Sequence, residues 1–483
     1  MNHLKKSTNY LLLKQYAQEV IEFDFRNDHF GNYKLHSEHL EINYNCQRAT
    51  PEILNVLFNL ASECKLEEKI RALIQGERVN TSQNIPALHT ALRVAEPSLL
   101  LVNELDVMPD ILIVREKMRL ISEQIHSGEW LGYSGKKITN IINIGIGGSD
   151  FGPRFCLNAL KDYVLSGVDY RFISDVDPRA FQEAIKNLNP ETTLFIISSK
   201  SFTTYETLYN AKKAMDWFDG QNIDNHFIAV TANRKKAEEL GISNILPIWN
   251  WVGGRYSLCS AINLITCIAI GYNFFMEFLA GAHSMDLHFQ KQDFHENMPV
   301  ILGLLGVWNI NFLSMSNLLI QVYGRQLELL VPYIQQLDME SNGKGFDTSE
   351  HKVDYATGPI VWGGMGNQAQ HSYYQLLSQS NHKVAADFIS LKEYDEEPIN
   401  RFCAEQIHVL SQGASSINNP SGTISGGMPI THIKLKACKP SNLGALIALY
   451  EHKIYVQSVL WNINPFDQPG VESAKIMNRR LKK

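Results

Sequence analysis

The chain has 483 residues, of which 45% are hydrophobic and 19% are charged. This composition supplies large buried cores and argues against an intrinsically disordered protein. The formal net charge of -6 gives no general attraction to nucleic acid or anionic lipid, although it leaves room for a local basic pocket that binds a small anion.

The first 110 residues are predicted to be mostly helical. Helical periodicity runs through KLEEKIRALIQGERVN from Lys65 and through IPALHTALRVAEP from Ile85. The apolar run from Tyr10 to Leu13 is far too short for a signal peptide. We therefore expect a helical N-terminal segment at residues 1–110 that packs on the larger part of the molecule.

The middle of the chain changes to strands that alternate with helices. A helical pattern from Pro109 is followed by the strand patterns KITNIINIGIGG, VDYRFISDVD, TTLFIISS, NHFIAVTAN and ISNILPIWN. Alternation of this kind is typical of βαβ units and a parallel sheet. We expect residues 111–280 to form a first, small α/β lobe that binds ligands beyond the carboxyl ends of its strands.

The segment IINIGIGGSDFG, residues 141–152, places glycines directly after the first of these strands. It matches the dinucleotide-binding fingerprint poorly, because the third glycine position holds Asp150. Asp175, at the end of the next strand, imitates the carboxylate that binds a ribose. Taken alone, the loop fits a nucleotide site, a site for another phosphorylated ligand, or a turn that binds nothing.

The loop SSKSFTTYET follows another strand and precedes a helix. It surrounds Lys200 with hydroxyl groups at a helix N-terminus, where free N–H groups and the positive dipole end attract anions. This pattern predicts a phosphate cradle, and the absence of P-loop glycines argues against a nucleoside triphosphate. The alternative is a group of hydroxyls that only cap the helix. Together, the two loops favour a small phosphorylated ligand.

Two long segments, residues 256–276 and 298–324, contain no charged residue. By length alone, either segment can span a bilayer. Each contains several amides and hydroxyls, which are costly in lipid, and neither has flanking aromatic and basic residues. We therefore predict buried helices inside a large α/β protein.

A second α/β half is predicted at residues 281–483. It contains LLIQVYGRQLELLVPYIQQLDME, GPIVWGGMGNQAQHSYYQLL, KVAADFISLKE and a final strand and helix from Thr431. No repeat and no long linker separates the halves. We expect two α/β lobes in tight contact, the second being the larger.

Three residues stand out as candidates for acid–base chemistry or anion binding. Arg255 follows two glycines just before an uncharged segment, Glu340 lies in QQLDMESNGK, and His371 is predicted at the start of a helix after GGMGN. A helix N-terminus lowers the pKa of a histidine and favours the neutral ring. Each residue also has an ordinary explanation: a structural ion pair, a solvated helix end and a common N-terminal histidine, respectively.

Metal and disulfide chemistry are not indicated. The seven cysteines are scattered and form no CxxC pair, which indicates reduced thiols in a reducing compartment. His283 and His288 flank Asp286 without a second cluster, so we interpret them as surface residues. The residues alone indicate a soluble α/β enzyme for a small phosphorylated substrate.

At these residues the sequence resembles the glucose-6-phosphate isomerases. The matching segments, in the order of the family, are GIGGSDFGP, SSKSFTTYET, GGRYSLCSAI, QLDMESNGK, QHSYYQLL and YEHKIYVQSVLWNINPFDQPGVE, followed by Lys475. MESNGK and FDQ-x-GVE together are highly specific. LHTALR at Leu88 is also similar to a helix of the family, although the polar residues usual before it are replaced by Asn84, Ile85 and Pro86.

The resemblance implies two sugar-isomerase-type lobes, each with a mainly parallel sheet flanked by helices. It also implies a cytoplasmic homodimer, with no metal, no organic cofactor, and neither nucleic acid nor membrane as a partner. The implied reaction is the interconversion of glucose 6-phosphate and fructose 6-phosphate in glycolysis and gluconeogenesis.

The resemblance assigns roles to individual residues. Glu340 corresponds to the general base and Arg255 to the arginine that stabilises the intermediate. His371 corresponds to the ring-opening residue, which reaches in from the partner subunit, and Lys475 lies near the ring oxygen. The implied substrate-binding residues are Gly148, Ser149, Ser199, Lys200, Ser201, Thr204, Gln336 and Gln468.

Some positions depart from the pattern of the family. Ser201 replaces a common threonine, Ser378 a common histidine, and Pro469 a common tryptophan between FDQ and GVE. Pro469 puts in doubt how Gln468 and Lys475 are held. Two alternatives stay open: a non-catalytic sugar-phosphate sensor, and an isomerase that prefers another sugar phosphate, such as mannose 6-phosphate.

Overall fold

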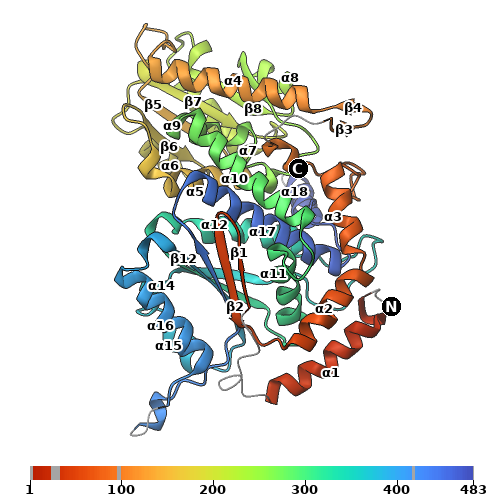
Figure 1. The fold of residues 1–483 in the computed structure, drawn as a ribbon. Helices are drawn as coiled ribbons and strands as arrows, with labels where there is room; N and C mark the ends of the chain where they lie inside the picture. Colours follow the sequence, from red (N-terminus) through yellow and green to blue (C-terminus); the bar gives the residue numbers. More distant parts are fainter. Residues whose placement is uncertain (1–3, 23–32, 95–98, 416–418, 482–483) are drawn as a thin grey trace.

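The computed structural model describes residues 4–22, 33–94, 99–415 and 419–481. Figure 1 shows two sheets in separate halves of the molecule, with the long helix α17 (Pro440–Leu460) in the region between them. The strands of one sheet fall within residues 140–247, and the four parallel strands of the other fall within residues 317–435. Two α/β lobes are therefore present, as predicted.

The smaller sheet has five parallel strands in the order β6-β5-β7-β8-β9. β7 and β8 are buried along their whole length, which explains why they read as continuous apolar runs. The strands are β5 (Asn140–Ile144), β6 (Asp169–Ile173), β7 (Thr193–Ser198), β8 (Phe227–Thr231) and β9 (Asn244–Pro247). The helices of this lobe are α4 (Met108–Ser127), α5 (Phe151–Ala159), α6 (Pro178–Ile185), α7 (Tyr205–Asp216) and α8 (Arg234–Glu239). The five predicted strands are confirmed.

The larger sheet has six strands in the order β1-β2-β13-β12-β10-β11. Its parallel strands are β10 (Asn317–Tyr323), β11 (Ile360–Met365), β12 (Val384–Leu391) and β13 (Ile430–Leu435). The N-terminal segment adds two antiparallel strands, β1 (Lys34–His36) and β2 (Leu40–Cys46), besides its helices α1 (Thr8–Glu22), α2 (Pro51–Glu63) and α3 (Leu66–Gln75). The prediction of a mostly helical segment did not include these two strands. β2 shows the alternating burial of a strand with one covered face.

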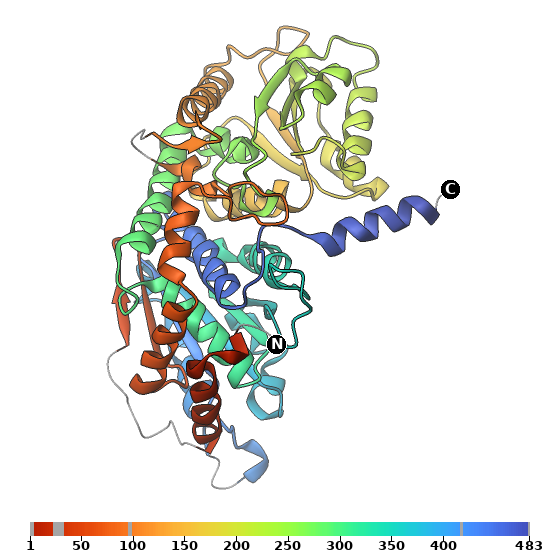
Figure 2. The ribbon, with the colours of Figure 1, turned by 90° about the vertical axis from the view of Figure 1, so that its right-hand side faces the viewer.

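The outer face of the larger lobe and the C-terminal end of the chain carry further helices. They are α14 (Gly366–Ala369), α15 (Tyr374–Gln379), α16 (Pro398–Gln412) and α18 (Pro469–Leu481). A short hairpin of β3 (Leu101–Val102) and β4 (Leu105–Asp106) precedes α4. Figure 2 shows that α18 projects away from the body of the chain.

Helix α17 forms the centre of the core, and nearly all of its residues are buried. It packs against α10 (Tyr272–Lys291) and α11 (Met298–Val307). A Cβ atom on Gly444 of α17 would lie 2.0 Å from the carbonyl oxygen of Phe278 on α10, so only glycine permits this close approach.

The uncharged segments fold inside the protein. The first contains α9 (Leu264–Ile270) and the start of α10, and the second contains α11, a π-helical turn at Trp308–Phe312 and the strand β10. The prediction of buried helices is confirmed for α9 and α11 but is wrong for β10, because periodicity alone does not distinguish a buried strand from a buried helix. In the part of the chain that the structure describes, no helix is both long and apolar enough to span a membrane.

Candidate active site

A cavity of about 370 Å³ lies between the two lobes, beyond the carboxyl ends of β5 and β7. Parallel sheets commonly bind ligands in this position. Residues of both lobes line the cavity, and those that the sequence predicted are Gly148, Ser149, Ser199, Lys200, Ser201, Thr204, Arg255, Gln336, Glu340 and Gln468. The fold thus brings together residues that are far apart along the chain.

The glycine-rich loop after β5 forms one wall of the cavity. A Cβ atom on Gly148 would lie 2.1 Å from the carbonyl oxygen of Gly254, so this glycine lets the loop pack against the turn that carries Arg255. Asp150 is paired with Arg154 at 2.7 Å, and the exposed Asp175 accepts a hydrogen bond from the backbone N–H of Asp177. The loop therefore packs closely against another turn of the small lobe, and neither aspartate lines the cavity.

The hydroxyl-rich loop between β7 and α7 forms the second wall. Thr204 is the N-cap residue of α7, but its side chain makes no capping hydrogen bond. The Ser199 hydroxyl is buried and has no hydrogen-bond partner among the described residues. Ser201 and Thr203 bond to each other, with 2.7 Å between their hydroxyl oxygens. Helix capping therefore does not account for Ser199 and Thr204, which face the cavity as unused donors.

Lys200 lies in the same loop with its ammonium group largely buried. Its Nζ donates hydrogen bonds to the carbonyl oxygens of Asn250, at 2.9 Å, and Val252, at 2.7 Å. Burial lowers the pKa of Lys200 to about 8, because removal from water disfavours the charged form. A cation beside free hydroxyls is suited to binding a phosphate group.

Arg255 is held rigidly beside the cavity. Its Nε donates to the Ser341 hydroxyl at 2.7 Å, and its Nη1 donates to the Gln468 side chain at 3.1 Å. Its Nη2 donates to the backbone carbonyls of Pro465 and Asp467. The side chain is only 3% exposed. All of these acceptors are neutral, so they fix the guanidinium group without cancelling its charge.

Glu340 is the carboxylate nearest to this guanidinium. It follows a π-helical turn, Gln335–Met339, and begins the short helix α13 (Glu340–Asn342). Its Oε2 lies 3.4 Å from Nη1 of Arg255 and accepts a hydrogen bond from Gln336 at 3.3 Å. The Glu340 side chain is 25% exposed, so it combines a fixed cationic neighbour with access to the cavity.

Gln468 marks the end of the cavity next to α18. Its Nε2 donates to Glu472 at 2.9 Å, while its Oε1 accepts from Arg255. Pro469 is the first residue of α18, a position that suits proline because no helical N–H is needed there. Lys475 lies within α18, but its side chain is outside the described residues.

His371 is the one candidate whose described side chain lies away from the cavity. It is exposed and lies in the turn between α14 and α15. The prediction that it starts a helix is wrong, because α14 begins earlier, at Gly366.

Several lining residues were not predicted. They are Asn80, Gln83, Asn250, Trp251 and Phe466. Asn80 is positioned by Asn464, whose Nδ2 donates to its Oδ1 at 2.9 Å. The only sequence feature that pointed to the contact between Asn464 and Asn80 was the run of amide side chains in NINPFDQ. The two tryptophans of PIWNW stack with 5.0 Å between their rings, and nothing in the pattern indicated that.

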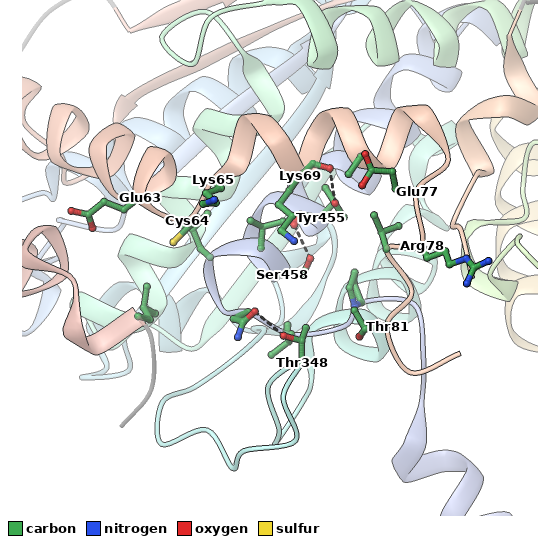
Figure 3. Close-up of a pocket in the computed structure, with 18 residues that line it drawn as sticks. Glu63, Cys64, Lys65, Lys69, Glu77, Arg78, Thr81, Thr348, Tyr455 and Ser458 are labelled. Atoms are coloured by element: carbon green, nitrogen blue, oxygen red, sulfur yellow. Dashed lines mark hydrogen bonds between the residues drawn. The ribbon is translucent and has the colours of Figure 1, made fainter. Parts of the chain in front are cut away.

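A second cavity, of about 350 Å³, lies between α3 and the C-terminal end of α17 (Figure 3). Lys69 extends into it from α3 toward Ser458, whereas Glu63 points away and is hydrogen-bonded to Asn9 of α1 and to Ser7, which precedes that helix. The second cavity has no carboxylate held beside a fixed arginine among its described lining residues, whereas the interlobe cavity has Glu340 beside Arg255. The interlobe cavity is therefore the better candidate for chemistry.

The described ranges contain no group of three or more His, Cys, Asp or Glu side chains that could hold a metal ion. His283 and His288, interpreted from the sequence as surface residues, are only partly exposed, and Asp286 between them does not lie at the surface. This carboxylate is buried, bonded to Arg93 at 2.6 and 2.7 Å and to His452 at 2.7 Å. The cluster joins the His89–Arg93 turn, α10 and α17, and is structural.

Known proteins resemble the chain over nearly its whole length. The family model described as phosphoglucose isomerase matches residues 43–483. A glucose-6-phosphate isomerase of Legionella pneumophila (strain Paris) is 57% identical over 443 residues, which cover 92% of this chain and 89% of the relative. A glucose-6-phosphate isomerase of Shewanella oneidensis is 41% identical over 513 aligned residues, which cover 99% and 94% of the two chains.

Solved structures also resemble the chain over most of its length. The crystal structure of a glucose-6-phosphate isomerase from Chlamydia trachomatis superposes with a TM-score of 0.92 at 26% sequence identity, covering 99% of this chain and 96% of that chain. A hypothetical protein from Thermus thermophilus shares the fold with a TM-score of 0.72 at 20% identity, covering 91% and 99%. The chain belongs to the phosphoglucose isomerase family.

Proposed function

We propose that this protein reversibly interconverts glucose 6-phosphate and fructose 6-phosphate, as a cytoplasmic enzyme of glycolysis and gluconeogenesis. The observation that carries the proposal is the Glu340 carboxylate 3.4 Å from the fixed Arg255 guanidinium, in the same cavity as the hydroxyl-rich loop. Membership of the family supports this assignment. A pure binding protein needs the anion-binding loop but not a base held beside a rigid cation.

The phosphate group binds at the β7–α7 loop. The hydroxyls of Ser199, Ser201 and Thr204 and the Lys200 ammonium supply donors, together with the free N–H groups of the first turn of α7. Gly148 and Ser149 form the opposite wall. This anchor fixes the sugar so that its reacting carbons lie near Glu340.

Ring opening comes first, because the sugar phosphate is mainly cyclic in solution. A hydroxyl proton must move to the ring oxygen, and the family assigns this work to a histidine and a lysine. His371 is exposed in the single chain and lies outside the cavity, which fits delivery of His371 from the partner subunit of a homodimer. The projecting helix α18, which carries Lys475, also fits contact with a second copy (Figure 2).

Proton transfer between the two carbons follows. Glu340 takes the proton from C2 of the open aldose and returns it to C1, so one carboxylate serves as base and then as acid. The enediolate formed between these steps is negatively charged. Arg255, fixed by neutral acceptors, offsets that charge without having to reorganise, while Gln336 and Gln468 orient Glu340 and the substrate.

The test is conversion of fructose 6-phosphate by the purified full-length chain with EDTA present, followed by a coupled assay for glucose 6-phosphate. We expect metal-independent turnover. Mannose 6-phosphate as substrate, with formation of fructose 6-phosphate as the readout, tests the alternative specificity, and a higher kcat/KM for it would replace the proposed substrate. Absence of turnover on either sugar phosphate would refute the proposal.

A further inference from the structure

Lys344 lies just outside the candidate active site and contacts the segment that carries Glu340. Its Nζ donates to the carbonyl oxygens of Glu340 and Ser341, both at 2.7 Å. Its backbone is fixed as well, since Thr357 Oγ1 accepts from its N–H at 3.1 Å and donates to its carbonyl at 2.7 Å. Its side chain is only 8% exposed. A rigid ammonium thus caps the end of α13.

The same ammonium faces Asp467, on the segment that leads to Gln468. Nζ of Lys344 lies 3.6 Å from Oδ1 of Asp467, and this oxygen is buried with no hydrogen-bond partner in the described part of the chain. The other carboxylate oxygen accepts from Asn464 at 3.0 Å, and the backbone carbonyl of Asp467 accepts from Arg255 at 2.9 Å. Lys344 therefore joins the two segments that surround Arg255.

We propose that Lys344 is a positioning residue: its protonated ammonium holds the Glu340 segment and the Asp467–Gln468 segment together around Arg255, and turnover falls when it loses its proton. The inference rests on the proposed isomerase function and adds a group that acts without touching substrate. A neutral amine has only two N–H groups for three facing oxygens, so one contact must become a repulsion.

The burial of Lys344 and the charges that face it determine the pH at which it loses its proton. Burial lowers the pKa of Lys344 to about 8, and Arg255 also lowers it, whereas Asp467 and Glu340 raise it. The group is charged below this pKa and neutral above it, so kcat is predicted to fall as pH rises through about 8.

Lys200 also has a pKa lowered to about 8, but its effect is separable. A bound phosphate dianion favours the ammonium form of Lys200, so at saturating substrate this residue stays charged. Its titration therefore appears in KM, whereas that of Lys344 appears in kcat.

The experiment measures kcat at saturating fructose 6-phosphate from about pH 6.5 to 9.5 for wild type, Lys344→Arg and Lys344→Met. We expect the wild-type kcat to fall above about pH 8. Lys344→Arg is expected to keep its own neutral-pH kcat across the range, because a guanidinium does not titrate there. Lys344→Met is expected to lose about tenfold in kcat at neutral pH and to show no alkaline fall. Lys200→Arg, the control, should retain the wild-type fall in kcat.

An alkaline fall with the same midpoint in Lys344→Arg as in wild type would overturn the inference, as would a wild-type kcat that stays constant. If Lys344→Met does not fold, as judged by its circular dichroism, Asp467→Asn provides the second test. Removing the carboxylate that raises the pKa of Lys344 should move the alkaline fall to lower pH, and an unmoved midpoint would overturn the inference. A wild-type enzyme with no isomerase activity would instead refute the proposed function.

Discussion

The guanidinium of Arg255 lies 3.4 Å from the carboxylate of Glu340, although its strongest hydrogen bonds go to four neutral oxygens. A fixed cation with neutral supports keeps most of its charge for an anion that forms nearby. Arg255→Lys is therefore predicted to lower kcat by about 10²- to 10³-fold, because lysine cannot reproduce the forked contacts. Steady-state kinetics with fructose 6-phosphate checks this, and a kcat within about threefold of wild type would contradict the assigned role.

Ser199 provides a test of the phosphate cradle that leaves the fold intact. Its buried hydroxyl has no protein partner among the described residues, so Ser199→Ala should not lower the Tm. Loss of a hydrogen bond to a charged phosphate should raise KM by about tenfold or more.

The neighbouring Ser198→Ala is the matched control, because the Ser198 hydroxyl donates to Asn143 at 2.8 Å. That variant should lower the Tm by leaving a buried amide oxygen without its partner. Equal KM values for Ser199→Ala and wild type would argue against phosphate binding at this loop.

Lys200 makes substrate affinity dependent on pH. Burial lowers its pKa to about 8, so the ammonium is present below this pH and is lost as pH rises through it. The phosphate of the substrate has a second pKa near 6, so its charge is constant in this range. KM is therefore predicted to increase above about pH 8 in wild type and to stay constant in Lys200→Arg. A parallel increase in both proteins would assign the effect to another group.

Arg93 is predicted to be essential for stability. Its fully buried guanidinium pairs with Asp286 and Glu451, so replacement by methionine leaves two buried carboxylates without their cation. Arg93→Met should reduce the free energy of unfolding by about 3–5 kcal/mol. Denaturant unfolding measures this change, and the surface variant Arg119→Met, which breaks only solvent-screened ion pairs, should leave the free energy of unfolding nearly unchanged.

Much of the fold could be predicted because the smaller sheet follows simple rules. β5, β7 and β8 are short, largely apolar runs that end in, or are followed by, glycines or hydroxyl-bearing residues, and the strands of this sheet alternate with helices. β10 could not be assigned in the same way, because its residues continue an uncharged segment begun by α11. β2 was missed although the side chains in LEINYNC alternate between covered and less covered faces.

Some residues of the candidate site could be predicted from the sequence itself, and others could not. The hydroxyls around Lys200 indicated a phosphate cradle from the residues themselves, because they precede a helix. The pairing of Glu340 with Arg255 was expected only from the resemblance, since the two residues come from different lobes. Lys344 is the last residue of the motif MESNGK, but its contacts could not be predicted, because it binds backbone carbonyls and a carboxylate supplied by a distant segment.

The central claim is that Glu340 is the general base, and one comparison of turnover tests this claim most directly. The measurement is kcat for fructose 6-phosphate, with EDTA present, for wild type and Glu340→Gln side by side. Because glutamine keeps the shape of the side chain but cannot accept the proton, we predict a fall in kcat of about 10²- to 10⁴-fold, with substrate still bound. A Glu340→Gln enzyme with near-wild-type kcat, or a wild type that does not turn over fructose 6-phosphate, would contradict the claim.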